Sequence, residues 1–184
     1  MPPSPDLEEG RDPHVVTFEE VAEAAGVSRA LVYNYFRDKG ELVAAVYVRS
    51  LRRLDAALAA AVGGEFRVDL HLPLVVRTYL RFAEADPEAF RNLVDTETAH
   101  HPKVREAKRA RLTAIAGSWG GTPEAHVVAS AVVGLLEAAT VAWLEEQDLG
   151  GDLDRVADVL VAVLRDGLQG AALAGFPIDG PRFA

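Results

Sequence analysis

Side chains that can read DNA bases gather in one short segment, residues 28–39, with the sequence SRALVYNYFRDK. Arg29 can donate two parallel hydrogen bonds to O6 and N7 of guanine, and Asn34 can read adenine or bond a phosphate. Ala30 and Leu31 are small or apolar, so they can meet the methyl group of thymine. The chemistry indicated by these residue types is recognition of a DNA groove.

Two short helices around a glycine turn are the elements that would position these side chains. Thr17 and Glu20 have the spacing of a capping box, in which each side chain accepts from the other residue's backbone N–H. They predict a helix from Phe18 to about Ala25. Gly26 supplies the left-handed backbone conformation that ends such a helix, and Ser28 is suited to cap the next one.

The apolar positions indicate how the two helices pack. Val21, Ala22 and Ala25 fall on one face of the first helix, and we expect all three to point inward. Gly26 and Val32 are turn and branched-apolar positions that, with Ala22, let two helices cross closely at a steep angle. The outer face of the second helix is then free to carry polar and aromatic side chains.

A third helix is predicted from Asp38 and Glu41 to the Gly63–Gly64 pair. The net charge of the chain is −9, and an acidic protein is not expected to bind the phosphate backbone. The distribution reverses that inference, because residues 28–53 hold six basic residues against two acidic ones, a local balance of +4. The basic residues are Arg29, Arg37, Lys39, Arg49, Arg52 and Arg53.

The segment from Thr17 to Val46 resembles the DNA-binding half of the TetR-type transcriptional regulators. The resemblance lies in AGVSRALVYNYFRDK, which has the AGVS turn, the Tyr-x-Tyr-Phe recognition helix and the following lysine, and it covers about 30 of the 184 residues. It implies an all-α fold: an N-terminal three-helix helix-turn-helix domain, followed by a helical bundle for ligand binding and dimerisation. The DNA-facing positions that it implies are Thr17, Ser28, Arg29, Ala30, Leu31, Tyr33, Asn34, Tyr35 and Lys39.

Some of these positions are suited to phosphates, which orient a protein on DNA without carrying sequence information. We assign this role to Thr17, Tyr33, Tyr35 and Lys39. An alternative is that Tyr33 or Tyr35 packs against the third helix instead. For Arg29 the alternative is a solvated side chain without a DNA role.

The first 16 residues differ from the family pattern, because its first helix is short or missing here. Pro2, Pro3, Pro5, Gly10 and Pro13 interrupt the segment, and a single turn through Glu9 would bury little apolar surface. We therefore expect an irregular N-terminal arm over 1–16, with the helix-turn-helix domain over 17–62. Either the protein starts further upstream or this version reads DNA poorly, and we favour the upstream start.

Residues 65–175 predict a helical ligand-binding and dimerisation domain, followed by a tail over 176–184. Helices are expected over about 70–85, 87–95 and 102–118, with Pro73 in the first turn of the first of them. Two longer apolar helices, about 123–146 and 152–173, hold more apolar surface than one small domain can cover. We expect them to pair with their copies as a four-helix bundle in a homodimer.

The stretch from Val127 to Leu144 has Glu137 as its sole charge and is long enough to raise the question of a membrane span. Its small residues, the carboxylate near its middle and the absence of flanking basic clusters favour a buried helix of a soluble protein. No charged-then-apolar leader opens the chain, so we expect a cytoplasmic protein without a membrane partner.

An effector pocket should lie in the C-terminal domain, lined by aromatic residues and isolated polar groups. The candidates are Tyr79, Phe82, Phe90, Trp119, Glu137, Thr140 and Trp143. Each can instead be ordinary core. Glu137 must be paired, protonated or ligand-bound in an apolar helix, and a salt bridge to an arginine of this chain or its partner is the alternative to a ligand.

Enzymatic and metal-dependent functions find no support in the sequence. It has no cysteine, no glycine-rich phosphate loop and no GxSxG or HExxH motif. Glu97 with His100 and His101 resembles half of a metal site, but no second half is present, so we expect no metal and no cofactor.

The sequence therefore predicts a ligand-responsive transcriptional regulator, most simply a repressor that binds a palindromic operator on double-stranded DNA as a homodimer. Its effector would be a small molecule whose identity the residues leave open. A different class remains as the alternative: a dimeric ligand- or protein-binding helical bundle whose DNA-binding domain is vestigial.

Overall fold

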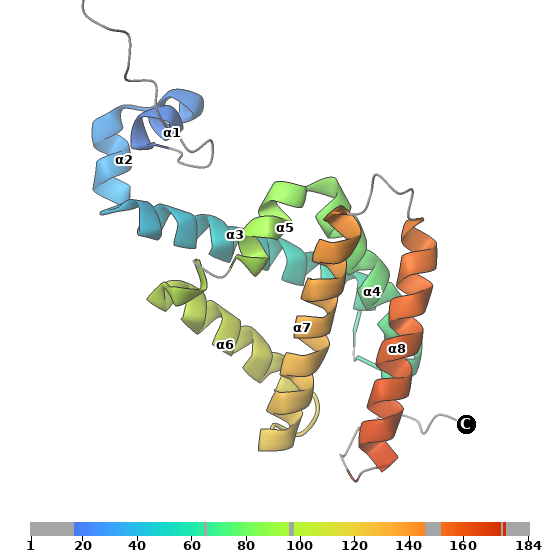
Figure 1. Cartoon of the computed structure of the whole chain (residues 1–184). Helices are drawn as coiled ribbons and strands as arrows, with labels where there is room; N and C mark the ends of the chain where they lie inside the picture. The colour runs from blue at the N-terminus through green and yellow to red at the C-terminus, as the bar shows by residue number, and fades with distance from the viewer. Residues whose placement is uncertain (1–16, 65, 96–97, 146–151, 174, 176–184) are drawn as a thin grey trace, which may run out of the picture. The chain divides into compact units, whose positions relative to one another are not determined.

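The computed structural model describes residues 17–64, 66–95, 98–145, 152–173 and 175 (Figure 1). The expected all-α class is confirmed, since these residues form helices and no strand. The elements are α1 (Phe18–Ala25), α2 (Arg29–Tyr35), α3 (Lys39–Val62), α4 (Val68–Ala85), α5 (Pro87–Val94), the short 3-10 helix η1 (Thr98–His100), α6 (Pro102–Gly117), α7 (Pro123–Glu145) and α8 (Leu153–Leu173). The predicted N-terminal arm, residues 1–16, and the predicted tail, 176–184, lie outside the described residues.

The chain divides into two compact units, with the division between Val43 and Ala44. Unit 1 holds α1, α2 and the first residues of α3, whereas unit 2 holds the rest of α3 and all later helices. Helix α3 is therefore the covalent element that the two units share.

Helix α1 begins and ends at the predicted residues. The hydroxyl Oγ1 of Thr17 accepts from the N–H of Glu20 at 3.2 Å, and Oε2 of Glu20 accepts from the N–H of Thr17 at 2.7 Å, which completes the capping box. Gly26 follows the helix at φ 65°, a conformation that other residues rarely adopt. The N–H of Val27 then donates to the carbonyl of Ala22 at 3.0 Å and closes the turn.

A small apolar cluster holds unit 1 together. Phe18, Ala22 and Val32 are buried, with Val21 partly buried beside them. The expectation that Ala25 points inward is wrong, because its side chain is exposed. Ala25 is the last residue of α1, and the positions that meet α2 lie one and two turns earlier.

The third helix starts where Asp38 and Glu41 predict it. Oδ1 of Asp38 accepts from the N–H of Glu41 at 2.8 Å, so Asp38 caps α3. The carboxylate of Glu41 turns back and accepts from the backbone N–H and the guanidinium of Arg37, at 3.0 and 2.8 Å. These bonds fix the turn between α2 and α3.

Unit 2 encloses one main core to which α3, α4, α5, α6, α7 and α8 all contribute. Helix α4 packs against α8, and α6 packs against α7 (Figure 1). Val76, Leu80 and Ala83 are fully buried, as their spacing on α4 predicts. Helix α4 begins two residues earlier than expected, so Pro73 lies inside the helix rather than in its first turn.

Helix α7 is the one described helix that is long and apolar enough to cross a membrane, with a mean hydropathy of 2.0 over its most apolar window. Length and composition alone are weak support for a span, because core helices of globular proteins meet the same criteria. Ala125, Ala129, Leu136, Thr140, Trp143 and Leu144 are buried along one side of α7 within unit 2.

Candidate functional site

Helix α2 exposes almost every side chain that it carries. Val32 is its one buried residue, whereas Tyr33 and Tyr35 remain 55% and 73% exposed. Eight of the nine residues expected to face DNA are exposed, and Thr17 is half-buried. Helix α2 is thus anchored at one position and presents the remainder of its surface to solvent.

The two tyrosines of α2 differ in how they are held. The ring of Tyr33 meets the buried ring of Phe18 edge-on, with centroids 4.9 Å apart and an interplanar angle of 73°. Tyr33 is therefore oriented by α1 while its outer part stays exposed. The high exposure of Tyr35 disfavours the alternative in which its ring packs against another helix.

Arg29 is paired, but weakly. Its Nη1 lies 3.5 Å from Oε1 of Glu19, and both side chains are largely exposed, at 69% and 40%. Exposed ion pairs contribute little to stability, so Arg29 can exchange Glu19 for a base edge or a phosphate. The side chain is neither buried nor committed to the fold.

The two hydroxyl residues already serve as helix caps. Ser28 Oγ accepts from the N–H of Leu31 at 3.3 Å, which leaves its own proton available to a phosphate. Thr17 Oγ1 both accepts from the N–H of Glu20 and donates to its carboxylate at 2.8 Å. The structure therefore engages Thr17 more completely than Ser28 in local hydrogen bonds.

The excess of basic over acidic residues along 28–53 is divided between the two units. The described residues of unit 1 carry three basic side chains against five acidic ones. Arg49, Arg52 and Arg53 lie on the part of α3 that belongs to unit 2, where Arg53 pairs with Asp86 at 2.9 Å. Counting along the chain overstated the positive charge of the helix-turn-helix itself.

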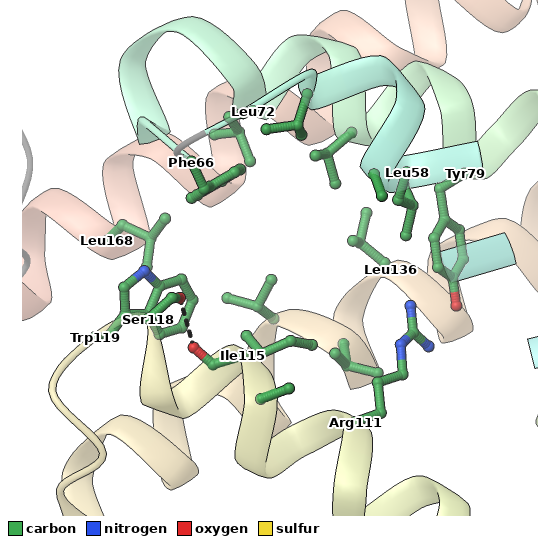
Figure 2. Close-up of a pocket in the computed structure, with 17 residues that line it drawn as sticks. Leu58, Phe66, Leu72, Tyr79, Arg111, Ile115, Ser118, Trp119, Leu136 and Leu168 are labelled. Atoms are coloured by element: carbon green, nitrogen blue, oxygen red, sulfur yellow. Dashed lines mark hydrogen bonds between the residues drawn. The ribbon is translucent and has the colours of Figure 1, made fainter. Parts of the chain in front are cut away.

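Unit 2 contains an apolar cavity of about 560 Å³, within the range of small-molecule sites (Figure 2). Its lining comes from α3, α4, α6, α7, α8 and the segments between them. The lining residues are Leu58, Ala59, Val62, Gly64, Phe66, Leu72, Val75, Tyr79, Arg111, Ala114, Ile115, Ser118, Trp119, Val132, Val133, Leu136 and Leu168.

Two of the seven predicted pocket residues, Tyr79 and Trp119, line this cavity. The others lie outside its lining. Phe90 is fully buried and its ring meets that of Tyr79 edge-on, with centroids 5.6 Å apart. Phe82 lies under the guanidinium of Arg53 at 5.7 Å, and Thr140 and Trp143 are buried in α7. Glu137, also on α7, is half-buried.

Arg111 is the one charged residue among the described lining residues, and it is not one of the predicted pocket residues. It lies on α6 in a basic cluster with Lys103, Arg105, Lys108 and Arg109, a pattern that by itself predicts a solvated face or ion pairs with neighbouring carboxylates. Its side chain is 12% exposed, and its Nε lies 3.1 Å from Oδ1 of Asp55 on α3. Helical spacing is the sequence signal that could have placed Arg111 at the cavity, because Ala114, Ile115 and Ser118 lie on the same helical face.

Arg111 and Tyr79 lie together at one end of the cavity, and Ser118 lies on the opposite side (Figure 2). The hydroxyl of Tyr79 points toward the guanidinium of Arg111 (Figure 2), and it is fully buried without a hydrogen-bond partner among the described residues. Burial raises the pKa of this hydroxyl above its ordinary range, so it stays protonated. Burial also raises the pKa of the Asp55 carboxyl, against the opposing effect of Arg111.

Glu137 lies in the same electrostatic environment. Burial raises the pKa of its carboxyl, while the charges of Lys108 and Arg111 act in the opposite direction. Among the described residues, no ion pair of Glu137 within 4.0 Å is present. For metals, no group of three or more histidine or acidic side chains lies together in the described part of the chain, and Glu97 falls outside it.

Comparison with known proteins finds similarity to bacterial transcriptional regulators. Residues 9–46 match the family model for bacterial regulatory proteins of the tetR family. The HTH-type transcriptional regulator Rv0472c of Mycobacterium tuberculosis is 28% identical over 182 residues, which covers 89% of this chain and 74% of that protein.

Solved structures of the same kind share the fold. FadR from Bacillus subtilis, in complex with stearoyl-CoA, aligns with a TM-score of 0.65 at 16% identity, covering 82% of this chain and 88% of that one. A tetR-family transcriptional regulator from Streptomyces coelicolor aligns with a TM-score of 0.65 at 24% identity, covering 89% and 77%.

Proposed function

We propose that the chain is a cytoplasmic, ligand-responsive repressor of the TetR family of bacterial transcriptional regulators, which binds a palindromic operator as a homodimer. The observation that carries this proposal is the exposure of α2, a helix whose one buried residue is Val32. A helix with that exposure, held by a second helix across a glycine turn, can enter a major groove.

The proposal divides the exposed residues by chemistry. Arg29 and Asn34 read base edges, and Ala30 and Leu31 are placed to meet thymine methyl groups. The phosphate contacts fall to Thr17, Ser28, Tyr33, Tyr35 and Lys39. Thr17 requires a rearrangement of its capping bonds before it can donate, so we expect it to contribute least.

The exposed faces of α7 and α8 support the homodimer. Each face consists mainly of small or apolar residues, which allow helices to approach closely. On α7 they are Val127, Ala131, Gly134, Ala138 and Ala142, and on α8 they are Val159, Ala162, Val163, Gly167 and Gly170. A second copy of the chain would cover both faces and place two α2 helices about 34 Å apart on DNA.

The substitution Val163→Glu tests the dimer directly. Val163 is 50% exposed, so a carboxylate there should leave the monomer folded. We expect sedimentation to change from dimer to monomer, while Arg109→Glu, an exposed substitution on α6, leaves the dimer intact. A wild-type monomer at all concentrations contradicts this part of the proposal.

The cavity of unit 2 supports ligand responsiveness. Its volume of about 560 Å³ and its apolar lining suit a small-molecule effector. The stearoyl-CoA bound to Bacillus subtilis FadR indicates that a protein of this fold can bind a ligand with a long hydrocarbon chain. Such a ligand changes DNA affinity only if it binds the two conformations of the dimer with different affinity.

One observation favours the alternative function, a ligand- or protein-binding bundle with a vestigial DNA-binding domain. The described residues of unit 1 carry more acidic than basic side chains, which disfavours contact with phosphates. The alternative predicts DNA binding that is weak and indifferent to sequence.

Selection of binding sites from random double-stranded DNA by the purified protein separates the two functions. The repressor predicts recovery of an imperfect palindrome, with binding that weakens as salt rises. Arg29→Ala should cost about 1 to 3 kcal/mol of discrimination at one base position. Tyr33→Ala should weaken binding on all sequences alike, and Arg109→Ala is the control for loss of a positive charge elsewhere.

A further inference from the structure

The ion pair at the polar end of the cavity is asymmetric. Arg111 is 12% exposed and lines the cavity, whereas its partner Asp55 is 45% exposed and does not. If the pair opens, the Asp55 carboxylate can return to water at little cost, but the guanidinium of Arg111 stays in an apolar site. A buried cation without an anion is strongly unfavourable, so opening of the pair requires a replacement anion.

We infer that the cavity binds an anionic amphiphile, a hydrocarbon body with one carboxylate that takes the place of Asp55 on Arg111 and accepts from the Tyr79 hydroxyl. This inference rests on the proposed ligand-responsive function and names the chemical class of the effector. The occupant has one anionic end, because Arg111 is the one charged residue among the described lining residues.

The lining away from Arg111 supports the hydrocarbon body. Leu58, Phe66, Leu72 and Leu168 surround the space, and Arg111 is the single charged residue among the described lining residues (Figure 2). The hydroxyl of Ser118 already donates to the carbonyl of Ile115 at 2.7 Å. A second polar group on the ligand would therefore lose its hydration without an evident partner.

The polar end selects a carboxylate over an amine or a neutral group. Two donors converge there, the guanidinium of Arg111 and the unpartnered hydroxyl of Tyr79. A carboxylate accepts from both, and hydrogen bonds between charged partners are stronger than neutral ones. An ammonium group would meet the like charge of Arg111, and an alcohol would leave that charge uncompensated once Asp55 departed.

Replacement of Asp55 by the ligand carboxylate also affects α3, the helix that connects unit 2 to unit 1 along the chain. Asp55 lies on α3, Arg111 on α6, and their pair is a direct contact between these two helices. Ligand binding removes that contact. Since α3 starts at Lys39 in unit 1, the helix that loses this contact with α6 is the one continuous with unit 1.

Calorimetric titration of the full-length protein with three chain-matched probes tests the ligand class. We use dodecanoate, dodecan-1-ol and dodecylammonium, each below its micelle concentration. Dodecanoate should bind at least about tenfold more tightly than the alcohol, which corresponds to about 1.4 kcal/mol, and the ammonium should bind most weakly. Equal binding of acid and alcohol overturns the inference, as does tighter binding of dodecanoyl-CoA, which lacks the free carboxylate.

Substitutions on α6 locate the anion. Arg111→Gln should abolish the preference for dodecanoate over dodecan-1-ol, whereas Arg109→Gln on the exposed side of the same helix should preserve it. If Arg111→Gln does not fold, Arg111→Lys keeps the charge and should retain a reduced preference. Loss of the preference in both Arg109→Gln and Arg111→Gln assigns the effect to general charge and overturns the inference.

The substitution Asp55→Asn tests whether the Asp55 carboxylate competes with the ligand carboxylate for Arg111 or instead helps to hold Arg111 in position for the ligand. If Asp55 competes with the ligand, its neutralisation should raise dodecanoate affinity several-fold and leave the affinity for dodecan-1-ol unchanged. Weaker dodecanoate binding overturns the exchange. These titrations contain no DNA, so a failure of the ligand assignment is separate from a failure to select an operator.

Discussion

The outer face of α2 and the cavity of unit 2 are organised in opposite ways. The α2 face consists of neighbouring residues on one short helix, exposed and held by a single buried position, Val32. The cavity brings together residues from Leu58 to Leu168, on five helices, and most of its lining is apolar. The first surface is built locally and the second depends on packing across the whole unit.

The difference predicts how function and stability are coupled in each region. Substitutions on the exposed face of α2 should change DNA binding with little effect on unfolding, since few contacts are lost. Truncation of apolar side chains near the cavity should change ligand binding and stability together, because these side chains also belong to the core. Four changes test this contrast.

Phe90→Ala should have the largest effect. Phe90 is fully buried and meets Tyr79 edge-on, so truncation should lower the free energy of unfolding by about 3 to 5 kcal/mol. Urea denaturation measures the change. Leu31→Ala, on the exposed face of α2, is the matched apolar truncation and should stay within about 0.5 kcal/mol. Similar losses in the two variants would remove the contrast between the regions.

Gly26→Ala should come next, with its effect confined to unit 1. A Cβ at φ 65° should cost roughly 1 to 2 kcal/mol in the turn between α1 and α2. Hydrogen exchange of the α1 and α2 amides should accelerate while that of unit 2 stays unchanged. Gly117→Ala, in open space without a positive φ, is the control. Faster exchange throughout the chain contradicts a locally built reading unit.

Asp86→Ala should remove about 1 kcal/mol from unit 2 at neutral pH, the usual contribution of a helix cap. Asp86 accepts from the N–H of Ala89 at 3.1 Å and pairs with Arg53. The N–H of Ala89, with Arg53, holds the pKa of this carboxyl below its ordinary value of 3.8.

The sign of the pH dependence follows from that depressed pKa. The contribution of Asp86 is complete above the unfolded-state value of 3.8 and is lost as the pH falls through the lower folded-state value. Denaturation of wild type and Asp86→Ala should therefore converge in acid. Asp86→Asn keeps the cap without the charge, and a stability difference that persists in acid contradicts the assignment.

Tyr79→Phe should have the smallest effect on folding. The hydroxyl is buried without a partner, so its removal should leave stability unchanged or raise it by up to about 1 kcal/mol. Dodecanoate affinity should nevertheless fall about tenfold, since a hydrogen bond to a charged group is lost. A clear loss of stability would show that the hydroxyl serves the fold rather than the ligand.

The helices of both units were predictable because their ends are local. Thr17 with Glu20, Gly26, Ser28 and Asp38 each lie within four residues of the groups that they cap. The predicted burial of Ala25 was wrong because it does not depend on local groups. Whether Ala25 is exposed depends on where α2 crosses α1. Helix periodicity alone does not contain that crossing point.

The cavity was predictable only in part. Aromatic residues on expected helices included Tyr79 and Trp119, which line it, and Phe90, whose ring meets that of Tyr79 edge-on. By sequence alone Arg111 is one member of a basic cluster, because no residue near it along the chain indicates that it pairs with Asp55. The pairing of these two residues arises from the packing of α3 against α6.

The sequence by itself determined the helical class, the caps of α1, α2 and α3, and the motif that predicts a DNA-reading helix. Each of these depends on hydrogen bonds and periodicities within a few residues. Only the tertiary structure decided which side chains face the cavity and that Arg111 is nearly buried beside an unpartnered Tyr79 hydroxyl. The physical reason is that burial sums contacts from helices far apart in the chain, whereas capping and amphipathicity do not.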